Sequence, residues 1–193
     1  MATELSARRS GIFVALGANL PGPGGTTPLQ TCQAALAALA GAGIRVVARS
    51  SWYSTEPVGE PGQPWFVNAV VRVETGLGPE ALLAALHRIE GRFGRRRDRH
   101  WAARTLDLDL LDYHGMVRDP GAGDGAGAGP ILPHPRIAGR RFVLAPLAEI
   151  APDWRLPPAG PDVARLLAAL PLRPEVARLP QPADFLDERP QDD

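Results

Sequence analysis

The sequence predicts an α+β fold in which helices pack on an antiparallel β-sheet, in the ferredoxin-like order βαββαβ. Strand-like and helix-like stretches follow one another in that order along the chain. The 193 residues, 45% of them hydrophobic, have the length and apolar content of about one domain. Neither an internal repeat nor a linker divides the chain, so we expect one sheet with a layer of helices over one face.

The first half of the chain contains three expected strands and two expected helices. A short apolar run ends at Gly17, and an Ala/Leu-rich stretch with helical spacing stops at Gly41. A β-branched and aromatic stretch follows, and after a Pro/Gly-rich loop the side chains alternate between two faces. Pro79 lies where a helix begins. These patterns predict strands at residues 12–16, 44–55 and 65–75 and helices at residues 29–40 and 79–93.

The second half begins with a charged loop at residues 94–104 and a fourth strand at residues 105–113. A flexible Gly/Ala-rich excursion is expected at residues 120–130, followed by short helices at residues 141–150 and 162–170. The predicted organisation is a flexible N-terminus at residues 1–10, one domain at residues 11–170 and a loosely packed, acidic, Pro-rich tail at residues 171–193.

The charge composition excludes several classes of mechanism. The formal net charge is zero, and all 21 basic residues are Arg. A chain without Lys cannot form a lysine Schiff base or use a P-loop lysine, so any phosphate clamp must consist of Arg. The single cysteine, Cys32, excludes an intramolecular disulfide and is expected to be a buried thiol. Because no apolar run resembles a signal peptide or a membrane span, we expect a cytoplasmic protein.

Asp107 and Asp109 are the first candidate site residues. In the expected strand, Leu106, Leu108 and Leu110 share one face and the two aspartates share the other. Two carboxylates on one strand face repel each other unless cations or solvent compensate, and their hard oxygens suit one or two Mg²⁺ ions. For an isolated Asp-x-Asp, the alternative is an ordinary solvated strand face.

The loop before this strand is rich in arginine. From Arg88 to Arg104 there are seven Arg against two carboxylates, and charges at this density need anionic partners such as a triphosphate. Trp101 lies within this run, where it could pack over a base or close the loop. A solvated basic loop or a general nucleic-acid patch is the alternative. His134, held between two prolines, is either a further phosphate-side candidate or an ordinary loop histidine.

Phe66 and Asn68 form another candidate group. They stand two residues apart on an expected strand, so an aromatic ring and an amide point to the same face. This pair suits a flat heterocycle, which would stack on the ring and form hydrogen bonds with the amide. The alternative is a core phenylalanine beside an asparagine at a strand end.

Taken in order, these segments resemble one family, the 6-hydroxymethyl-7,8-dihydropterin pyrophosphokinases of folate biosynthesis. The resemblance covers roughly residues 11–155. Its most specific part is Arg-Thr-Leu-Asp-Leu-Asp at residues 104–109, followed by Pro-His-Pro-Arg at residues 133–136. The other matching segments are residues 16–20, 51–59, 63–69, 89–90, 94–97, 101, 140 and 142–147.

The resemblance implies transfer of a diphosphate from ATP to the hydroxymethyl oxygen of the pterin, with attack at the β-phosphorus and AMP leaving. Asp107 and Asp109 would hold two Mg²⁺ ions that bridge the ATP phosphates, and an aspartate near the metals is a candidate acceptor for the hydroxyl proton. Arg95 would swing onto the phosphates, and Arg104 would contact both sides of the site. The further ATP contacts implied are Glu90, Arg97, Trp101, Leu110, His134 and Arg140. The pterin contacts implied are Phe66 and Phe142 on its two faces, Asn68 and the backbone around Thr55 and Val58 at its edge, and Asn19 and Pro57 lining the pocket.

Two other functions fit parts of the same pattern. Another Mg²⁺-dependent phospho- or nucleotidyltransferase could use the aspartate pair but would leave the Phe66, Asn68 and Phe142 pocket unexplained. A ferredoxin-like RNA-binding module could use the arginine loop, but no strand carries the matching aromatics, and the aspartates would repel a phosphate backbone without metal. We therefore expect ATP and the pterin as partners, no nucleic-acid or membrane partner, and a monomer.

Overall fold

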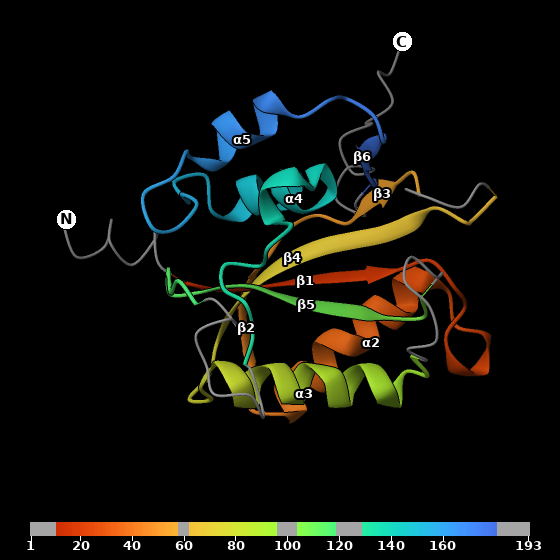
Figure 1. Cartoon of the computed structure of the whole chain (residues 1–193). Helices are drawn as coiled ribbons and strands as arrows, with labels where there is room; N and C mark the ends of the chain where they lie inside the picture. Colours follow the sequence, from red (N-terminus) through yellow and green to blue (C-terminus); the bar gives the residue numbers. More distant parts are fainter. Residues whose placement is uncertain (1–10, 58–61, 96–103, 119–128, 181–193) are drawn as a thin grey trace, which may run out of the picture.

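The computed structural model describes residues 11–57, 62–95, 104–118 and 129–180. Figure 1 shows a central sheet with helices on both sides. Short 3-10 helices occur at η1 (Pro23–Gly25) and η3 (Ile137–Gly139). The other elements are β1 (Ile12–Ala18), α2 (Pro28–Gly41), β2 (Arg45–Arg49), β3 (Tyr53–Thr55), β4 (Phe66–Glu74), α3 (Pro79–Arg92), β5 (Asp107–Tyr113), α4 (Arg141–Ile150), α5 (Val163–Ala169) and β6 (Val176–Arg178).

The strands of the sheet pair antiparallel in the order β5-β1-β4-β3-β6, and β2 also pairs with β4. β1 runs between β4 and β5, with Leu16 opposite Ala69 on one side and Leu108 on the other. The predictions of an antiparallel sheet and of helices packed on it are confirmed. The strands expected at residues 12–16, 65–75 and 105–113 correspond to β1, β4 and β5.

The strand expected at residues 44–55 is divided into β2 and β3, so its prediction as one strand is wrong. The interruption lies at Ser50, which is buried. The Ser50 hydroxyl accepts a hydrogen bond from the Val70 amide at 3.0 Å, and the Ser50 amide donates to the Val70 carbonyl at 3.0 Å. A side-chain oxygen therefore takes a place that a backbone carbonyl would hold in a regular ladder.

Helices cover both faces of the sheet, so the expectation of one covered face is wrong. α2 and α3 pack on one face, and α4 and α5 pack on the other (Figure 1). Both faces of β1 are apolar, because Phe13 points into one core while the hydrophobic residues before and after it in the strand point into the other. The first core includes Val14, Leu16, Cys32, Leu39, Leu86 and Leu108, and the second core includes Phe13, Val70, Leu111, Leu144, Leu147 and Trp154.

The helix ends follow from local sequence signals. α2 begins with a capping box, in which the Thr27 hydroxyl accepts from the Gln30 amide and the Gln30 side chain accepts from the Thr27 amide. Pro28 and Pro79 occupy first-turn positions of α2 and α3. All four expected helices are confirmed, and α4 has the predicted bounds. Cys32 is a buried thiol, as expected, and burial raises its pKa to about 12.

A buried carboxylate ties the second core to β5. Asp112 Oδ2 accepts a hydrogen bond from the Trp154 indole N–H at 2.7 Å, and Oδ1 accepts from the Gly115 amide at 2.9 Å. Burial raises the pKa of the Asp112 carboxyl, although these hydrogen bonds favour its ionised form. The chain after α4 is therefore fixed to the sheet by a polar contact inside an apolar core.

β6 is an unexpected strand, because it lies within the stretch predicted to be a loosely packed tail. Val176–Arg178 pairs with β3, and the Leu179 amide donates to the Trp52 carbonyl at 2.7 Å. A three-residue strand is too short to show a period of two in the sequence. The prediction of loose packing is therefore wrong for this strand, while residues 181–193 and 1–10 lie outside the described residues.

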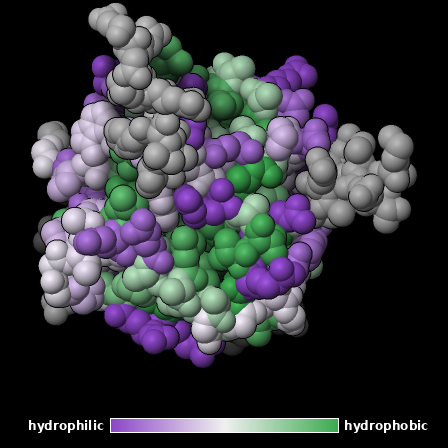
Figure 2. Space-filling view, turned by 180° about the vertical axis from the view of Figure 1, so that it is seen from behind, coloured by the Kyte–Doolittle hydropathy of each residue, from purple (hydrophilic) through white to green (hydrophobic). Residues whose placement is uncertain are grey.

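The surface mixes apolar and polar side chains. Seen from behind in Figure 2, hydrophobic residues are interrupted by hydrophilic ones. Within the described ranges, none of the helices combines the length and apolarity needed to cross a bilayer. The large hydrophobic side chains that are exposed in these ranges are Trp65, Met116, Val117, Ile131 and Leu172.

Candidate active site

The aspartates of β5 lie on the face opposite the three leucines, as predicted. Leu106, Leu108 and Leu110 are buried in the first core, whereas the side chains of Asp107 and Asp109 are 19% and 29% exposed. Because Leu110 points into that core and is only 3% exposed, its side chain is not available to a ligand beside the aspartates. The expected ATP contact of Leu110 therefore stays a prediction, and it would involve the main chain of this residue.

Cross-strand pairing aligns the aspartates with residues of β1 and β4. Asp107 lies opposite Gly17, and Gly17 lies opposite Asn68, while Asp109 lies opposite Ala15. Residues directly opposite each other point to the same face, so Asp107, Gly17 and Asn68 form one row across three strands. A Cβ atom on Gly17 would lie 2.9 Å from Asn68 Oδ1. Glycine at this position therefore lets the Asn68 amide lie directly against the strand.

Two arginines approach Asp107. Arg104 Nη1 pairs with Asp107 Oδ2, and Arg95 Nη1 lies 2.6 Å from Asp107 Oδ1. Among the described residues, Oδ1 is nevertheless a buried oxygen without a hydrogen bond of acceptable geometry. Burial, and then the charge of Asp109, raises the pKa of the Asp107 carboxyl, while both arginines oppose this shift. A further positive charge beside this oxygen would therefore be stabilising.

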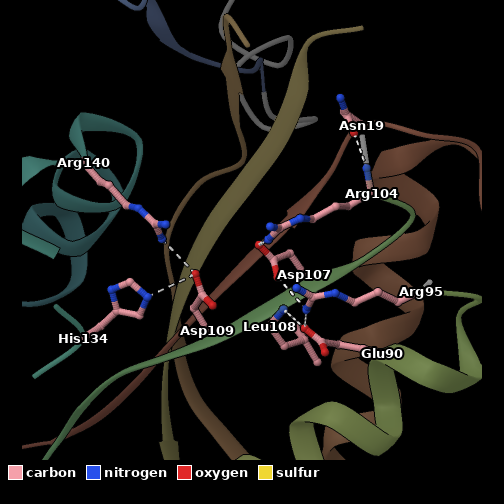
Figure 3. A network of polar contacts seen from close by, with 9 residues as sticks. All are labelled: Asn19, Glu90, Arg95, Arg104, Asp107, Leu108, Asp109, His134 and Arg140. Carbon is pink, nitrogen blue, oxygen red and sulfur yellow. Dashed lines mark hydrogen bonds and ion pairs between the residues drawn. The ribbon is translucent and has the colours of Figure 1, made fainter. Parts of the chain in front are cut away.

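Glu90 supports the same strand from α3 (Figure 3). It is only 1% exposed, and its Oε1 accepts a hydrogen bond from the Leu108 amide at 2.8 Å. The same carboxylate pairs with Arg95. Because Leu108 lies between the two aspartates, Glu90 fixes the backbone from which both side chains emerge. A direct contact between Glu90 and ATP stays a prediction.

Asp109 is bound from the opposite side by Arg140 and His134 (Figure 3). Arg140 Nη1 donates to Asp109 Oδ2 at 2.9 Å, and His134 Nε2 lies 3.7 Å from the same oxygen. His134 Nδ1 accepts a hydrogen bond from the Arg136 amide at 3.1 Å, so the neutral ring carries its proton on Nε2, facing Asp109. Burial lowers the pKa of His134, which favours this neutral form.

Asn19 joins Arg104 to the loop before β4. It is 1% exposed, its Oδ1 accepts from the Arg104 amide at 2.7 Å, and its Nδ2 donates to the Pro64 carbonyl at 3.2 Å. The Asn19 amide also donates to the Arg104 carbonyl at 3.0 Å. The resemblance implies only a pocket-lining role for Asn19. Its contact with Arg104 spans 85 residues of sequence, which no local pattern reveals.

Four of the predicted pterin residues lie on β3, on β4 and at the start of α4. Asn68 is buried, and its Nδ2 donates to Thr55 Oγ1 at 2.8 Å, which fixes the orientation of the amide. Phe66 is half-buried two residues earlier on the same face. Phe142 is half-buried in the first turn of α4, and the Arg140 guanidinium lies 5.6 Å from its ring centre. A sandwich of the pterin between the two rings stays a prediction.

Four predicted site residues lie at or beyond an edge of the described stretches. Pro57 is half-buried and follows β3, at the end of one described stretch. Val58, Arg97 and Trp101 lie outside the described residues. Their expected contacts therefore stay predictions.

The donor groups of the site fit a hard metal ion that arrives with a phosphate ligand. Asp107 and Asp109 offer carboxylate oxygens, and Asp107 Oδ1 is buried without a hydrogen bond. Within the described ranges, no set of three or more His, Cys, Asp or Glu side chains surrounds a common metal position. Mg²⁺ typically binds through one or two carboxylates, with phosphate oxygens and water as its other ligands. The site therefore suits Mg²⁺ with a nucleotide rather than a structural zinc ion, which needs four protein ligands.

Comparison with known proteins points to one family. The family model for 7,8-dihydro-6-hydroxymethylpterin-pyrophosphokinase (HPPK) matches residues 13–152. A curated 2-amino-4-hydroxy-6-hydroxymethyldihydropteridine pyrophosphokinase from Pseudomonas aeruginosa is 42% identical over 172 residues, which cover 88% of this chain and 96% of that protein. The protein of the same name from Synechocystis is 42% identical over 166 residues, which cover 86% and 78% of the two chains.

Solved structures share the fold. A crystal structure of Plasmodium falciparum HPPK-DHPS matches with a TM-score of 0.60 at 12% sequence identity, over 82% of this chain and 43% of that chain. This chain therefore spans less than half the length of that protein. At such low identity, the likeness concerns the fold alone.

Proposed function

Because the chain belongs to the 7,8-dihydro-6-hydroxymethylpterin-pyrophosphokinase family, we propose how its site residues divide the work of the family's reaction. The enzyme transfers a diphosphate from ATP to 6-hydroxymethyl-7,8-dihydropterin in folate biosynthesis. The hydroxymethyl oxygen bonds to the β-phosphorus of ATP, the bond between that phosphorus and the bridging α-phosphate oxygen breaks, and AMP leaves. The proton of the hydroxyl group is released in the exchange.

Arginines would form the donor side of the site. Arg95 and Arg104 lie at Asp107, and Arg140 lies at Asp109, so three guanidinium groups surround the position assigned to the triphosphate. Phosphoryl transfer depends mainly on positioning and charge neutralisation, which arginine provides through bidentate hydrogen bonds. We assign Arg95 and Arg104 to the charge that develops during transfer. The residues assigned to ATP binding are Glu90, Arg97, Trp101, the main chain of Leu110, His134 and Arg140.

Asp107 and Asp109 would hold Mg²⁺, with two ions as the proposed number. The bound metal would neutralise charge on the phosphates and on the AMP that leaves. Two features support this assignment: the carboxylates share one strand face, and Asp107 Oδ1 lacks a hydrogen bond among the described residues. Glu90 would keep both carboxylates in place through its hydrogen bond to Leu108.

Residues of β3, β4 and α4 would hold the pterin. Asn68 presents its amide in one orientation because Thr55 accepts its Nδ2–H, so it can recognise the edge of a heterocycle. Phe66 and Phe142 would stack on the two faces of the ring. The remaining residues assigned to the pocket are Asn19, Pro57 and Val58.

The alignment of Asp107, Gly17 and Asn68 across three strands is the main support for this proposal. Neighbouring strands are about 4.8 Å apart, so the backbones of Asp107 and Asn68 are separated by about 10 Å. A pterin ring with its hydroxymethyl group spans a similar length. A pterin held at Asn68 could therefore direct its hydroxyl group toward phosphates held at Asp107.

Product analysis tests the proposal. The protein is incubated with ATP, Mg²⁺ and 6-hydroxymethyl-7,8-dihydropterin, and nucleotide products are separated by anion-exchange chromatography. We expect AMP in equal amount to the pterin diphosphate, and no product when Mg²⁺ is chelated. Formation of ADP would mean that a single phosphate moves, which contradicts the proposal.

We further propose the ferredoxin-like order for β1 to β5, a monomeric state and action in the cytoplasm. The order is supported when β2 and β3 are counted as one interrupted strand, because the sheet then runs β5-β1-β4-(β2/β3). Light scattering after gel filtration tests the monomer, and the mass of two chains would contradict it. Fractionation of cells that express the full chain tests the compartment.

A further inference from the structure

Residues 173–179 run along β3, on the side away from β4. Val176 pairs with Thr55, and the Leu179 amide donates to the Trp52 carbonyl at 2.7 Å. β3 has only three residues, so without this neighbour it would be a short edge strand bound on one side. The segment therefore supplies half of the backbone pairing that holds β3.

Glu56 anchors the start of this segment. The Glu56 amide donates to the Glu175 carbonyl at 3.0 Å, and its Oε2 accepts from the Glu175 amide at 3.2 Å and from Arg173 Nη1 at 2.9 Å. The Glu175 amide and the Arg173 guanidinium hold the pKa of the Glu56 carboxyl below its usual range. Glu56 stands between Thr55 and Pro57, two residues assigned to the pterin pocket.

Thr55 connects this anchored strand to the predicted recognition group. Its hydroxyl accepts the hydrogen bond from Asn68 Nδ2 at 2.8 Å, and both side chains are buried. A shift of β3 would remove this acceptor and leave a buried amide group unpaired, which is costly. The position of β3 therefore determines the orientation of the Asn68 amide.

The other end of the segment is linked through Ser51 to the helix that carries Phe142. Arg178 Nε donates to Ser51 Oγ at 2.8 Å, and the Ser51 hydroxyl donates to Glu149 Oε1 of α4 at 2.9 Å. Glu149 Oε2 also accepts from the Tyr53 hydroxyl at 3.0 Å. The segment thus contacts β3 directly and α4 through Ser51, and both elements border the predicted pterin pocket together with β4.

We propose that residues 173–179 form a positioning element for the acceptor side of the site, with Glu56 as its anchor. This inference rests on the proposed pterin pocket. The element would act through Thr55 on Asn68, whereas the pairs that Asp107 and Asp109 form with Arg104 and Arg140 involve none of its residues. The family match ends at residue 152, so the element lies beyond the matched span.

The test compares acceptor and nucleotide binding in Glu56→Ala and Arg173→Ala by isothermal titration calorimetry. For 6-hydroxymethyl-7,8-dihydropterin, we expect the Kd of Arg173→Ala to rise about fivefold, because a factor of this size corresponds to the loss of one exposed ion pair. Glu56→Ala should show a larger rise, because it also loses the bond to the Glu175 amide. The Kd for α,β-methylene-ATP with Mg²⁺ should stay within about twofold of wild type.

Two further variants sharpen the test. Arg173→Lys keeps the charge and should restore most of the acceptor affinity. Glu74→Ala removes an exposed glutamate of β4 that pairs with Arg45, so it is a matched control and should bind both ligands normally. Unfolding temperatures show whether each variant is folded. If Glu56→Ala is not folded, the Kd values of Arg173→Ala test the inference.

Unchanged acceptor affinity in the folded variants would overturn the inference. An equal loss of affinity for acceptor and nucleotide would also overturn it, because that result indicates a general structural role. Failure of the wild-type protein to bind the pterin would instead contradict the proposed pocket. The two failures are therefore distinguishable.

Discussion

Asp107 and Asp109 stand two residues apart, yet different parts of the chain neutralise them. Asp107 contacts Arg95 and Arg104, which flank the loop before β5, whereas Asp109 contacts Arg140 at the start of α4. Each carboxylate thus has its own arginine partners, and the repulsion between the two carboxylates is offset from two sides. This separation allows the loss of one carboxylate to be studied while the other keeps its partner.

Asp107→Ala and Asp109→Ala should each lower kcat by on the order of 10²–10³-fold, the scale of removing one preorganised electrostatic group. The affinity for the pterin should change little, because Asn68 and Thr55 remain paired. Steady-state kinetics and pterin titration check this expectation. Asp153→Ala removes an exposed carboxylate that follows α4 and serves as the control. Near-normal kcat in either site variant would contradict the metal assignment.

Asp112 should give the protein a distinctive dependence of stability on pH. Burial raises its pKa in the folded state above the ordinary value of about 3.9, so the folded protein retains a proton that the unfolded chain has released. This contribution is fully present below the unfolded pKa and is lost as pH rises through the folded pKa. Wild type should therefore gain stability relative to Asp112→Asn, which cannot titrate, as pH falls from about 7 to about 4.

Urea unfolding of both proteins at several pH values measures this difference. At neutral pH, Asp112→Asn should be less stable by about 1–3 kcal/mol, because one of the two donors, Trp154 or Gly115, would face an amide N–H. If the difference in unfolding free energy between the two proteins becomes smaller on acidification, folding does not raise the pKa of Asp112.

Residues of the site differ in how far the sequence could predict them. The shared face of Asp107 and Asp109 follows from strand periodicity, which depends only on local spacing. The Glu90–Leu108 and Asn19–Arg104 bonds join residues 18 and 85 positions apart, so they depend on the tertiary fold. Leu110 shows the converse: its ATP contact is implied by resemblance, and it would have to use the main chain because the side chain lies in the first core.

At the scale of elements, Glu90 joins α3 to β5. It lies near the C-terminal end of the helix, where the helix dipole disfavours negative charge, so it depends on the Leu108 amide and Arg95. The bond also determines where β5 runs beside α3. We therefore expect both stability and catalysis to depend on this buried side chain.

Glu90→Ala should lower the free energy of unfolding by about 1–3 kcal/mol, because it leaves the Leu108 amide buried without its acceptor. kcat should also fall, since Leu108 lies between the two aspartates. Glu80→Ala, on the same helix, removes an exposed pair with Arg118 and should cost less than about 1 kcal/mol. Equal losses in chemical denaturation would argue against a special role for Glu90.

Helices were easier to predict than strands for physical reasons. α2 and α3 both begin with proline, and α2 also has a capping box, signals that depend on neighbouring residues alone. The strand at residues 44–55 is interrupted because the Ser50 hydroxyl bonds to Val70, a partner 20 positions away. β6 is a strand only because β3 offers a free edge to a three-residue segment.

The whole molecule has two apolar cores separated by one sheet. Trp52 lies in the first core and Trp154 in the second, while β1 and β4 contribute residues to both. The helices α4 and α5 were expected, but their place on the second face escaped prediction, because an apolar strand face alone does not reveal which helix covers it. Since each core needs the same strands, we expect the two to unfold together.

Leu86→Ala in the first core and Leu147→Ala in the second should each cost about 2–5 kcal/mol. Both leucines are completely buried. In each variant, circular dichroism and tryptophan fluorescence should report one coincident unfolding transition at lower urea concentration. Two separate transitions would show that the faces of the sheet unfold independently.

Gly17 has a consequence for inhibitor design. Any side chain at this position would come within 2.9 Å of Asn68 Oδ1, so a substitution there would displace the amide assigned to substrate recognition. If a drug contacts the Gly17 backbone, a mutation of Gly17 that weakens binding of the drug should therefore also weaken binding of the natural substrate. Resistance should arise instead at positions around the site whose side chains can change without moving Asn68, and selection under such a compound would reveal them.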